Sequence, residues 1–222
     1  MENIKIKDIE TDRLLIKVPT MSEQKSLWNI IKLEEVNRYY FPTPNRIFDK
    51  YNLSKENISD LIQARMIFQK QLNDWERQKP FYKEKIRSIK NGDNGQKFTW
   101  SVFLKSGEVI GQMTVQPNEK YLDNPVIRDI GWFISPKYQG QGYAYETAKA
   151  ILDFMFLEVK IEKIITSAAV INTSSWKLME RLGFERIGEK KSTYLDENNQ
   201  IVNCFCYEVS CDKYLKKRNY SG

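Results

Sequence analysis

The feature that most constrains the fold is a block at residues 128–169 in which two extended runs flank one helix. Residues 128–134 and 161–169 alternate like strands, and a helix that begins at a glycine-rich turn and ends near Leu157 joins them. Two strands joined by a helix of this length can pair in parallel through a right-handed crossover. Because antiparallel hairpins flank the block, we expect an α/β fold with a mixed sheet.

The rest of the chain divides into a helical first half and a strand-rich second half. Residue alternation predicts further strands at 13–17, 98–104, 108–115, 184–193 and 202–210. Helical periodicity predicts helices at 22–38, 53–89 and 172–182, the first two capped by Ser22 and Ser54. Predicted breaks are a proline-rich segment at 41–44 and a glycine-rich loop at 91–95. We expect one domain over residues 1–222, with a helical insertion at about 42–97.

The chain has no histidine, which excludes several catalytic designs. Ser-His-Asp and Cys-His arrangements need an imidazole base. Proton transfer must therefore use Asp, Glu, Tyr, Lys, a chain terminus or water. The three cysteines, Cys204, Cys206 and Cys211, lack the CxxC or histidine partners of a metal site. We expect structural thiols and no metal.

Hydropathy and charge limit where the chain works and what it binds. The sequence has no run of about 18 apolar residues, and its first residues are charged rather than apolar like a leader peptide. We therefore expect a cytoplasmic protein with no membrane association. Its 35 Lys and Arg against 29 Asp and Glu give a formal charge of +6, which suits ligands with several phosphates but is too weak to indicate direct nucleic-acid binding. The sequence leaves room for a homodimer.

The glycine-rich turn is the strongest chemical signal. It consists of Gln139, Gly140, Gln141, Gly142, Tyr143 and Ala144. A helix N-terminus presents unpaired amide N–H groups and a partial positive charge, and glycines let a ligand approach the backbone. We therefore expect an anion cradle, most naturally for a pyrophosphate. A plain tight turn from strand to helix is the alternative.

Six stretches in order along the chain carry a family resemblance. They are ETDRL at 10–14, GEVIG at 107–111, IGWFISP at 130–136, QGQGYA at 139–144, NTSS at 172–175 and LGF at 182–184. This set resembles the GCN5-related N-acetyltransferase (GNAT) superfamily, most closely its branch of ribosomal-protein N-terminal acetyltransferases. The resemblance implies a mixed, mostly antiparallel sheet with a central splayed pair of parallel strands, flanked by helices.

The resemblance also implies acetyl-CoA as co-substrate and gives roles to individual residues. Backbone amides of residues 139–144 would hold the pyrophosphate. The strand residues that would bond the pantetheine are Trp132, Phe133 and Ile134. Asn172 would bond the pantetheine arm, and the Ser175 hydroxyl would protonate the leaving thiolate. The plainer alternative for Asn172 and Ser175 is helix capping.

Asp129 is the candidate general base, because it lies on the strand at 128–134 and burial would raise its pKa. A surface carboxylate at a strand end is the alternative reading. Glu108 is a weaker candidate, because it lies beside a hairpin turn.

These features together predict an N-acetyltransferase that acylates a primary amine, with a protein or peptide N-terminal α-amine as the first choice of acceptor. An α-amine with a pKa near 8 is about one tenth neutral at pH 7, whereas lysine is almost wholly charged. The alternatives are a small amine (a polyamine or an aminoglycoside), a regulatory module that binds acyl-CoA without turnover, and an RNA-associated adaptor using the basic run at 83–90. The aromatic residues that would line a small-amine pocket are Tyr39, Tyr40, Phe41, Trp75 and Phe81.

Overall fold

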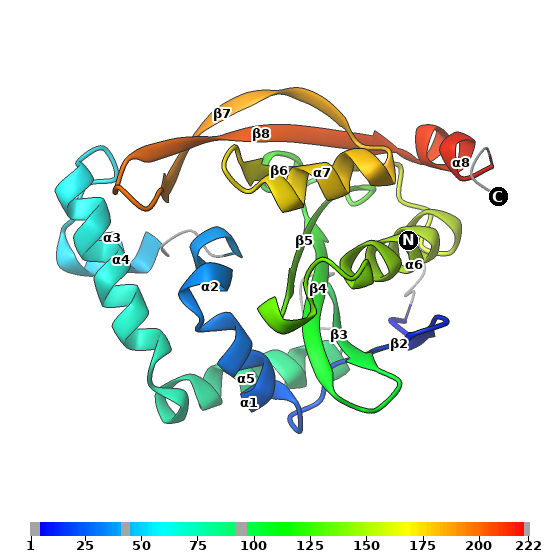
Figure 1. Ribbon diagram of the computed structural model, residues 1–222, viewed down its shortest axis with the longest axis horizontal. Helices are drawn as coiled ribbons and strands as arrows, with labels where there is room; N and C mark the ends of the chain where they lie inside the picture. Colours follow the sequence, from blue (N-terminus) through cyan, green and yellow to red (C-terminus); the bar gives the residue numbers. More distant parts are fainter. Residues whose placement is uncertain (1–4, 41–44, 92–96, 220–222) are drawn as a thin grey trace.

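The structure is a computed structural model that describes residues 5–40, 45–91 and 97–219. These residues form one eight-stranded sheet with helices on both faces (Figure 1). The strands are β1 (Ile9–Glu10), β2 (Leu14–Lys17), β3 (Phe98–Leu104), β4 (Val109–Pro117), β5 (Ile127–Ile134), β6 (Lys163–Ala169), β7 (Glu185–Leu195) and β8 (Ile201–Ser210). The helices are α1 (Gln24–Ile31), α2 (Glu34–Tyr40), α3 (Asn45–Tyr51), α4 (Ile58–Leu72), α5 (Trp75–Asn91), α6 (Tyr143–Leu157), α7 (Thr173–Leu182) and α8 (Cys211–Asn219), with 3-10 turns η1 (Glu119–Tyr121) and η2 (Pro136–Tyr138).

The sheet order is β1-β2-β3-β4-β5-β6-β8-β7, and β5–β6 is its parallel pair. The other neighbouring strands run antiparallel. β5, α6 and β6 form the crossover unit that the block at residues 128–169 predicts. The mixed, mostly antiparallel sheet expected from the sequence is thus confirmed.

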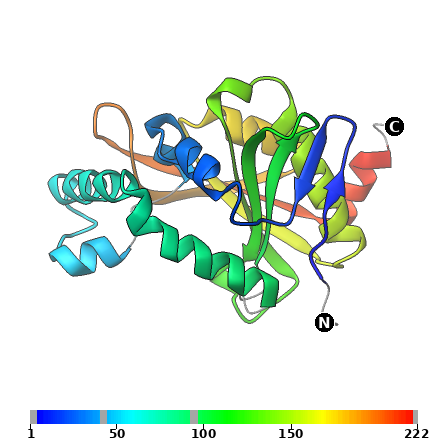
Figure 2. The same ribbon diagram turned by 90° about the horizontal axis from the view of Figure 1, so that it is seen from below.

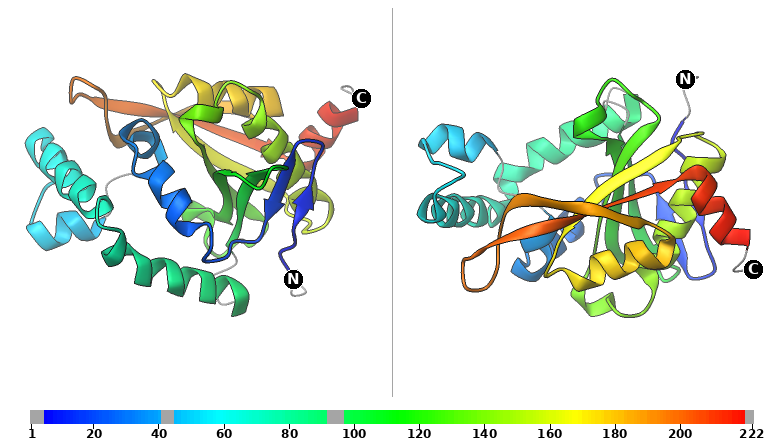
Figure 3. Two further views of the ribbon diagram at one scale, coloured as in Figure 1. Left: turned by 60° about the horizontal axis from the view of Figure 1, so that its bottom comes forward. Right: turned by 90° about the horizontal axis from the view of Figure 1, so that it is seen from above.

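Each face of the sheet has its own helical cover, and α6 and α7 lie on the side opposite to α5 (Figure 3). The main core lies under α6 and α7, where Ile151 and Leu182 belong to the same buried cluster as Trp100 and Ile164 of the strands. On the other face, Phe133 of β5 packs with residues of α1, α2 and α5. This double cover encloses the middle of the sheet.

Helices α3 and α4 lie at one end of the molecule, and α8 lies at the other (Figure 2). Helices α3 and α4 form a separate small core in which Phe48 and Leu61 pack with Leu195 of β7. The stretch expected as a helical insertion therefore reaches across to the end of the β7–β8 hairpin. Among the described helices, none combines the length and the apolar character needed to cross a membrane.

The predicted helix at 22–38 is wrong in its continuity and in its cap. It is two helices, α1 and α2, and the side-chain amide of Asn37 donates to the carbonyls of Lys32 and Leu33 at 3.0 Å, which satisfies the break between them. Before α1, the Thr20 amide and hydroxyl donate to the Glu23 carboxylate at 2.7 and 2.5 Å. Thr20 and Glu23 have the spacing of a capping box, but the N-cap of α1 is Glu23 and no side-chain hydrogen bond among the described residues caps it, so the predicted cap at Ser22 is wrong.

The predicted helix at 53–89 is likewise divided, into α4 and α5. Asn57 caps α4 by accepting from the Asp60 amide at 3.2 Å, so the predicted cap at Ser54 is wrong. Asp74 accepts from the Arg77 amide at 3.1 Å and begins α5. β1, α3 and α8 had no counterpart in the predicted elements. The predicted break at 41–44, and the loop at 91–95 after Asn91, lie outside the described residues.

Candidate active site

The parallel strands β5 and β6 separate soon after they meet. Their register holds two pairs, Ile127↔Lys163 and Arg128↔Ile164. By contrast, β5 pairs with β4 over seven positions, and β6 pairs with β8 over seven. Within the described chain, the edge of β5 beyond Arg128 is therefore no longer paired with β6 as a ladder. An extended ligand can hydrogen-bond to such an edge as an added strand.

Side chains bridge the point where the strands part. The Thr166 hydroxyl of β6 donates to the Ile130 carbonyl of β5 at 3.0 Å. The Asn118 amide, which follows β4, donates to the Ile165 carbonyl at 2.9 Å. Buried carbonyls need partners, and these two receive them from side chains where the ladder no longer supplies them. These two side-chain hydrogen bonds therefore stabilise the backbone where β5 and β6 separate.

The glycine-rich turn leads from this opening into α6. Gly140 and Gly142 have φ of +74° and +83°, a left-handed conformation that side chains disfavour. Gly142 is the N-cap of α6, and no side-chain hydrogen bond caps it in the described structure. The first turn of α6 therefore keeps the free amides that bind anions.

Arg13 braces this turn, and the sequence analysis did not single it out. Its guanidinium donates to the Glu146 carboxylate at 2.6 Å and to the Gln141 carbonyl at 3.1 Å, and it stacks 4.6 Å above the Tyr143 ring. The Thr11 hydroxyl also donates to Glu146, at 2.6 Å. Burial would raise the pKa of Glu146, but the hydrogen bonds from Thr11 and Arg13 outweigh it and lower that pKa. The ETDRL stretch at 10–14, which contains Arg13, is the sequence feature that could have identified this residue.

The side chains of Phe133 and Ile134 are buried in the protein, and Trp132 is partly buried. Their backbone, rather than their side chains, is what β5 offers to a ligand. The Gln139 side chain donates to the Ile134 carbonyl at 2.9 Å and ties the turn to the end of β5. Opposite, a Cβ on Gly111 of β4 would lie 2.3 Å from the Phe133 carbonyl oxygen, so the two strands approach too closely there for a side chain.

Asn172 and Ser175 lie at the start of α7. Asn172 holds the N-cap position, but its side chain makes no capping hydrogen bond, and its Oδ1 accepts from the Ser174 hydroxyl at 3.1 Å. Ser175 lies inside the first turn and donates its amide to the Asn172 carbonyl at 3.1 Å. Both side chains are partly exposed. The capping alternative therefore explains neither side chain.

Asp129 is partly buried on β5, next to the point where the strands part. Burial raises its pKa, while hydrogen bonds from Thr166, the Ile130 amide and Gln116 oppose the rise. The Ile130 amide lies 2.8 Å from its Oδ1. The alternative of a freely exposed carboxylate does not describe this position. Glu108, by contrast, pairs with Lys137 at 3.2 Å, and hydrogen bonds from Tyr138 and Lys137 lower its pKa.

Of the aromatic residues expected around a small-amine pocket, the structure describes the side chains of Tyr39, Trp75 and Phe81, and Trp75 and Phe81 both contact the ring of Tyr82. Trp75 packs against Trp28 at 5.4 Å and Tyr82 at 5.6 Å, in the cluster over Phe133. Phe81 is 61% exposed. Phe41 and the side chain of Tyr40 lie outside the described residues, and Tyr39 is partly buried on α2.

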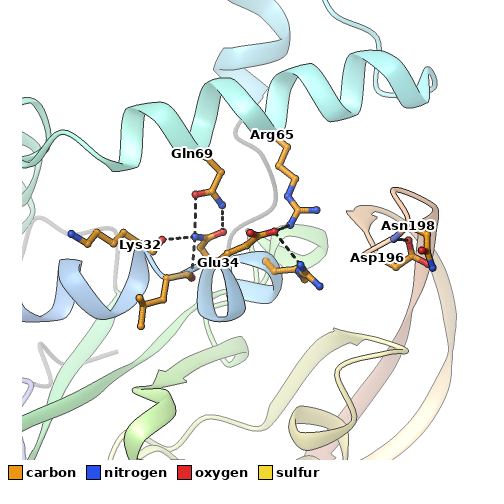
Figure 4. A network of polar contacts seen from close by, with 9 residues as sticks. Lys32, Glu34, Arg65, Gln69, Asp196 and Asn198 are labelled. Atoms are coloured by element: carbon orange, nitrogen blue, oxygen red, sulfur yellow. Dashed lines mark hydrogen bonds and ion pairs between the residues drawn. The ribbon is translucent and has the colours of Figure 1, made fainter.

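A polar network fastens α4 to α2 (Figure 4). Glu34 accepts from Arg38 at 3.0 Å and from Arg65 at 2.8 Å. Asn37 and Gln69 exchange hydrogen bonds across the same contact. Because α2 also contacts β5 and β7, this network holds α4 against the helices that cover this face of the sheet. Two guanidinium groups share one carboxylate there, and Glu35 of α2 and Asp60 of α4 offset the remaining positive charges of these two helices.

A cavity of about 540 Å³ lies elsewhere, between α1, the β3–β4 turn and η2. Glu23, Glu108 and Lys137 contribute to its lining, whereas Asp129 does not. It is therefore separate from the opening between β5 and β6. Over the part of the chain that the structure describes, no group of three His, Cys, Asp or Glu side chains is placed to hold a metal ion.

Comparison with known proteins gives related sequences and folds. The N-acetyltransferase YnaD of Bacillus subtilis, described as uncharacterized, is 36% identical over 98 residues, which cover 44% of this chain and about half (54%) of that protein. The spermidine N-acetyltransferase of Vibrio cholerae in complex with CoA and spermine has a TM-score of 0.67 at 18% identity, covering 92% of this chain and 99% of that one. The ribosomal-protein-S5-alanine acetyltransferase of Vibrio fischeri has a TM-score of 0.61 at 15% identity, covering 93% and 98%. At these identities the two structures show the fold alone.

The family model of the acetyltransferase (GNAT) domain matches residues 13–185, most of the chain. The matched range starts at Arg13 and includes the opening between β5 and β6, the glycine-rich turn and the start of α7. Sequence match, fold and site geometry agree, and the chain belongs to the GNAT family of acetyltransferases.

Proposed function

We propose that this protein transfers the acetyl group of acetyl-CoA to a primary amine, with a peptide N-terminal α-amine as the preferred acceptor. The observation that carries the proposal is the early end of the ladder between β5 and β6, followed along the chain by the N-terminus of α6, which no side-chain hydrogen bond caps in the described structure. An extended pantetheine fits the edge, and a pyrophosphate fits the free amides of the turn at residues 139–144. These features give one continuous binding surface for coenzyme A.

The chain's own residues would perform the proton transfers. The amine nitrogen forms a bond to the thioester carbon, and the carbon–sulfur bond breaks. Asp129 takes the proton that the amine loses, and its pKa raised by burial suits it to this role. The sulfur of the departing CoA takes a proton from the Ser175 hydroxyl, which water then restores. Amide N–H groups of β5 stabilise the negative charge that develops on the carbonyl oxygen.

The ionisation of the amine bears on the choice of acceptor. An α-amine is neutral in a larger fraction near pH 7 than a lysine or polyamine amine, so it needs less help from a base.

Coenzyme binding and turnover test this function separately. Calorimetry with acetyl-CoA and with CoA should give saturable heats. Thiol release from acetyl-CoA should then be followed with an alanine-initiated peptide, the same peptide blocked at its N-terminus, spermidine and an aminoglycoside. We expect release with the free peptide and none with the blocked one. Turnover of spermidine alone would refute the peptide assignment, and the absence of heat with either form of coenzyme A would refute the enzyme.

A further inference from the structure

Strand β7 forms one edge of the sheet, and the first part of this strand is exposed (Figure 1). Within the described residues the sheet order ends at β7, and its ladder partner there is β8. The residues from 185 to 191 are all exposed, including the apolar Ile187 at 51%. The outer N–H and C=O groups of such an edge can pair with a strand of another chain.

The charges of residues 185–190 are complementary to themselves in antiparallel pairing. The sequence of this segment is Glu-Arg-Ile-Gly-Glu-Lys. When two copies pair about its midpoint, Glu185 lies opposite Lys190 of the second copy, and Arg186 lies opposite Glu189 of the second copy. Each pair occurs twice by symmetry, so every charged residue of the segment meets an opposite charge. Opposite charges on directly facing residues stabilise a strand pair, and like charges destabilise it.

The bulge in β7 places these charges on matching faces of the sheet. The register with β8 shifts by one residue between Arg186 and Gly188, so Ile187 is an extra residue in β7. In a regular strand, residues three or five positions apart point to opposite faces, which would mismatch both kinds of charge pair. Because the bulge shifts the alternation by one residue, the two members of each pair share a face, as facing residues of paired strands must.

The contacts of β8 identify these two faces. Arg186 lies opposite Tyr207, and Glu189 lies opposite Phe205. The Tyr207 hydroxyl donates to a carboxylate of α7 at 2.9 Å, and the Phe205 ring lies 6.0 Å from an indole ring of α7. Arg186 and Glu189 therefore lie on the face that α7 covers. The other two charged residues of the segment lie opposite β8 residues that alternate with these aromatics, so they lie on the other face.

We propose that two copies of this chain associate by antiparallel pairing of residues 185–190, which joins their sheets edge to edge. Ile187 then lies opposite Gly188 of the second copy. A Cβ at Gly188 would meet no atom within 4 Å, so the Ile187 side chain has room there and is removed from water. Lysine on an edge strand commonly prevents pairing, but here the alternation of signs selects this one register. The association does not depend on acetyl-CoA.

Charge reversal tests this register on the full chain. Lys190→Glu places a carboxylate opposite Glu185, and Glu185→Lys places an ammonium group opposite Lys190, so each variant alone replaces two attractions by two repulsions. A mixture of the two variants restores both attractions. We expect sedimentation velocity over a concentration series to show a wild-type dimer, dimers at least about tenfold weaker for each variant alone, and a heterodimer of wild-type affinity in the mixture.

The matched control is Lys191→Glu, because this exposed lysine lies opposite the uncharged Phe184 in the same register. It should dimerise like the wild type. Circular dichroism checks that each variant is folded. If Glu185→Lys does not fold, because it loses its ion pair with Lys213, the comparison of Lys190→Glu with Lys191→Glu decides the test.

Hydrogen exchange locates the contact, since the outer amides of residues 185–190 should exchange more slowly in the dimer. A wild-type chain that stays monomeric over the whole series overturns the proposal, and so does a dimer in which these amides are not slowed. Equal weakening by Lys190→Glu and Lys191→Glu, or no weakening by either, also overturns it. A mixture of the two folded charge-reversal variants that does not associate overturns the register.

Discussion

Replacing Gly111 by alanine tests how closely β4 and β5 must approach. The added Cβ would lie 2.3 Å from the Phe133 carbonyl oxygen and 2.7 Å from Ile134 Cδ1, both on β5. Overfilling a packed core costs about 1–3 kcal/mol, and a collision with backbone, which no rotamer change relieves, belongs at the upper end. We therefore expect the free energy of unfolding to fall by about 3 kcal/mol or more.

Gly107 provides the matched control, because it lies in the turn between β3 and β4. Its φ is +90°, but a Cβ there would meet no atom within 4 Å. Gly107→Ala should therefore cost only the left-handed strain, about 1–2 kcal/mol. Urea denaturation followed by circular dichroism measures both variants.

The same pair separates stability from coenzyme binding. In Gly111→Ala the backbone at Phe133 and Ile134 must shift, so we expect acetyl-CoA to bind at least about tenfold more weakly, as a displacement of one well-placed hydrogen bond would produce. Gly107→Ala should keep the wild-type Kd. The reasoning is refuted if Gly111→Ala costs no more stability than Gly107→Ala, or if both bind acetyl-CoA like the wild type.

Three further predictions concern single side chains. Asp129→Asn should lower kcat by about 10²–10⁴-fold while calorimetry finds the Kd for acetyl-CoA unchanged; full activity would remove Asp129 from the mechanism. Lys85 of α5 donates to Gln112, and burial lowers its pKa to about 8. The folded state then binds fewer protons than the unfolded state between pH 8 and about 10.4, so stability should rise with pH by about 2–3 kcal/mol over that window, and Lys85→Met should abolish the rise in urea titrations, whereas the exposed Lys83→Met should not. Arg13→Ala should cost about 1 kcal/mol at pH 7, since its partner Glu146 has a lowered pKa. That contribution is lost as the pH falls through the folded pKa of Glu146, so the two proteins should converge in acid; an equal difference at all pH values would contradict the ion pair.

Much of the fold could be predicted because its signals are local. The alternation of residues predicts every strand from β2 to β8, and the turn at residues 139–144 predicts both the start of α6 and the crossover from β5 to β6. The errors also have local causes. The spacing of apolar residues continues through Lys32 and through Asn73, so it predicts single helices. In the structure, a hydrogen bond donated by Asn37 satisfies the end of one helix, and a hydrogen bond accepted by Asp74 begins another.

The residues of the candidate site also fall into those that the sequence predicts and those that only the structure identifies. Glycines 140 and 142 can be found from the sequence, because the left-handed turn that they permit depends on their own backbone. Arg13 and Thr166 act through partners more than 30 residues away, Gln141 and Glu146 for one and Ile130 for the other. Periodicity and spacing carry no information about such pairs, because these contacts exist only after the strands have been placed side by side.

The sequence by itself determined the class of fold, the glycine-rich turn before α6 and the exclusion of any histidine base, since these depend on residue type and on near neighbours along the chain. Tertiary structure decided where β5 and β6 separate, which side chains satisfy the carbonyls exposed there, and how burial sets the pKa of Asp129. The physical reason is that hydrogen-bond partners and desolvation are properties of the space around a group, and in this fold that space is shared by β4, β5, β6 and β7.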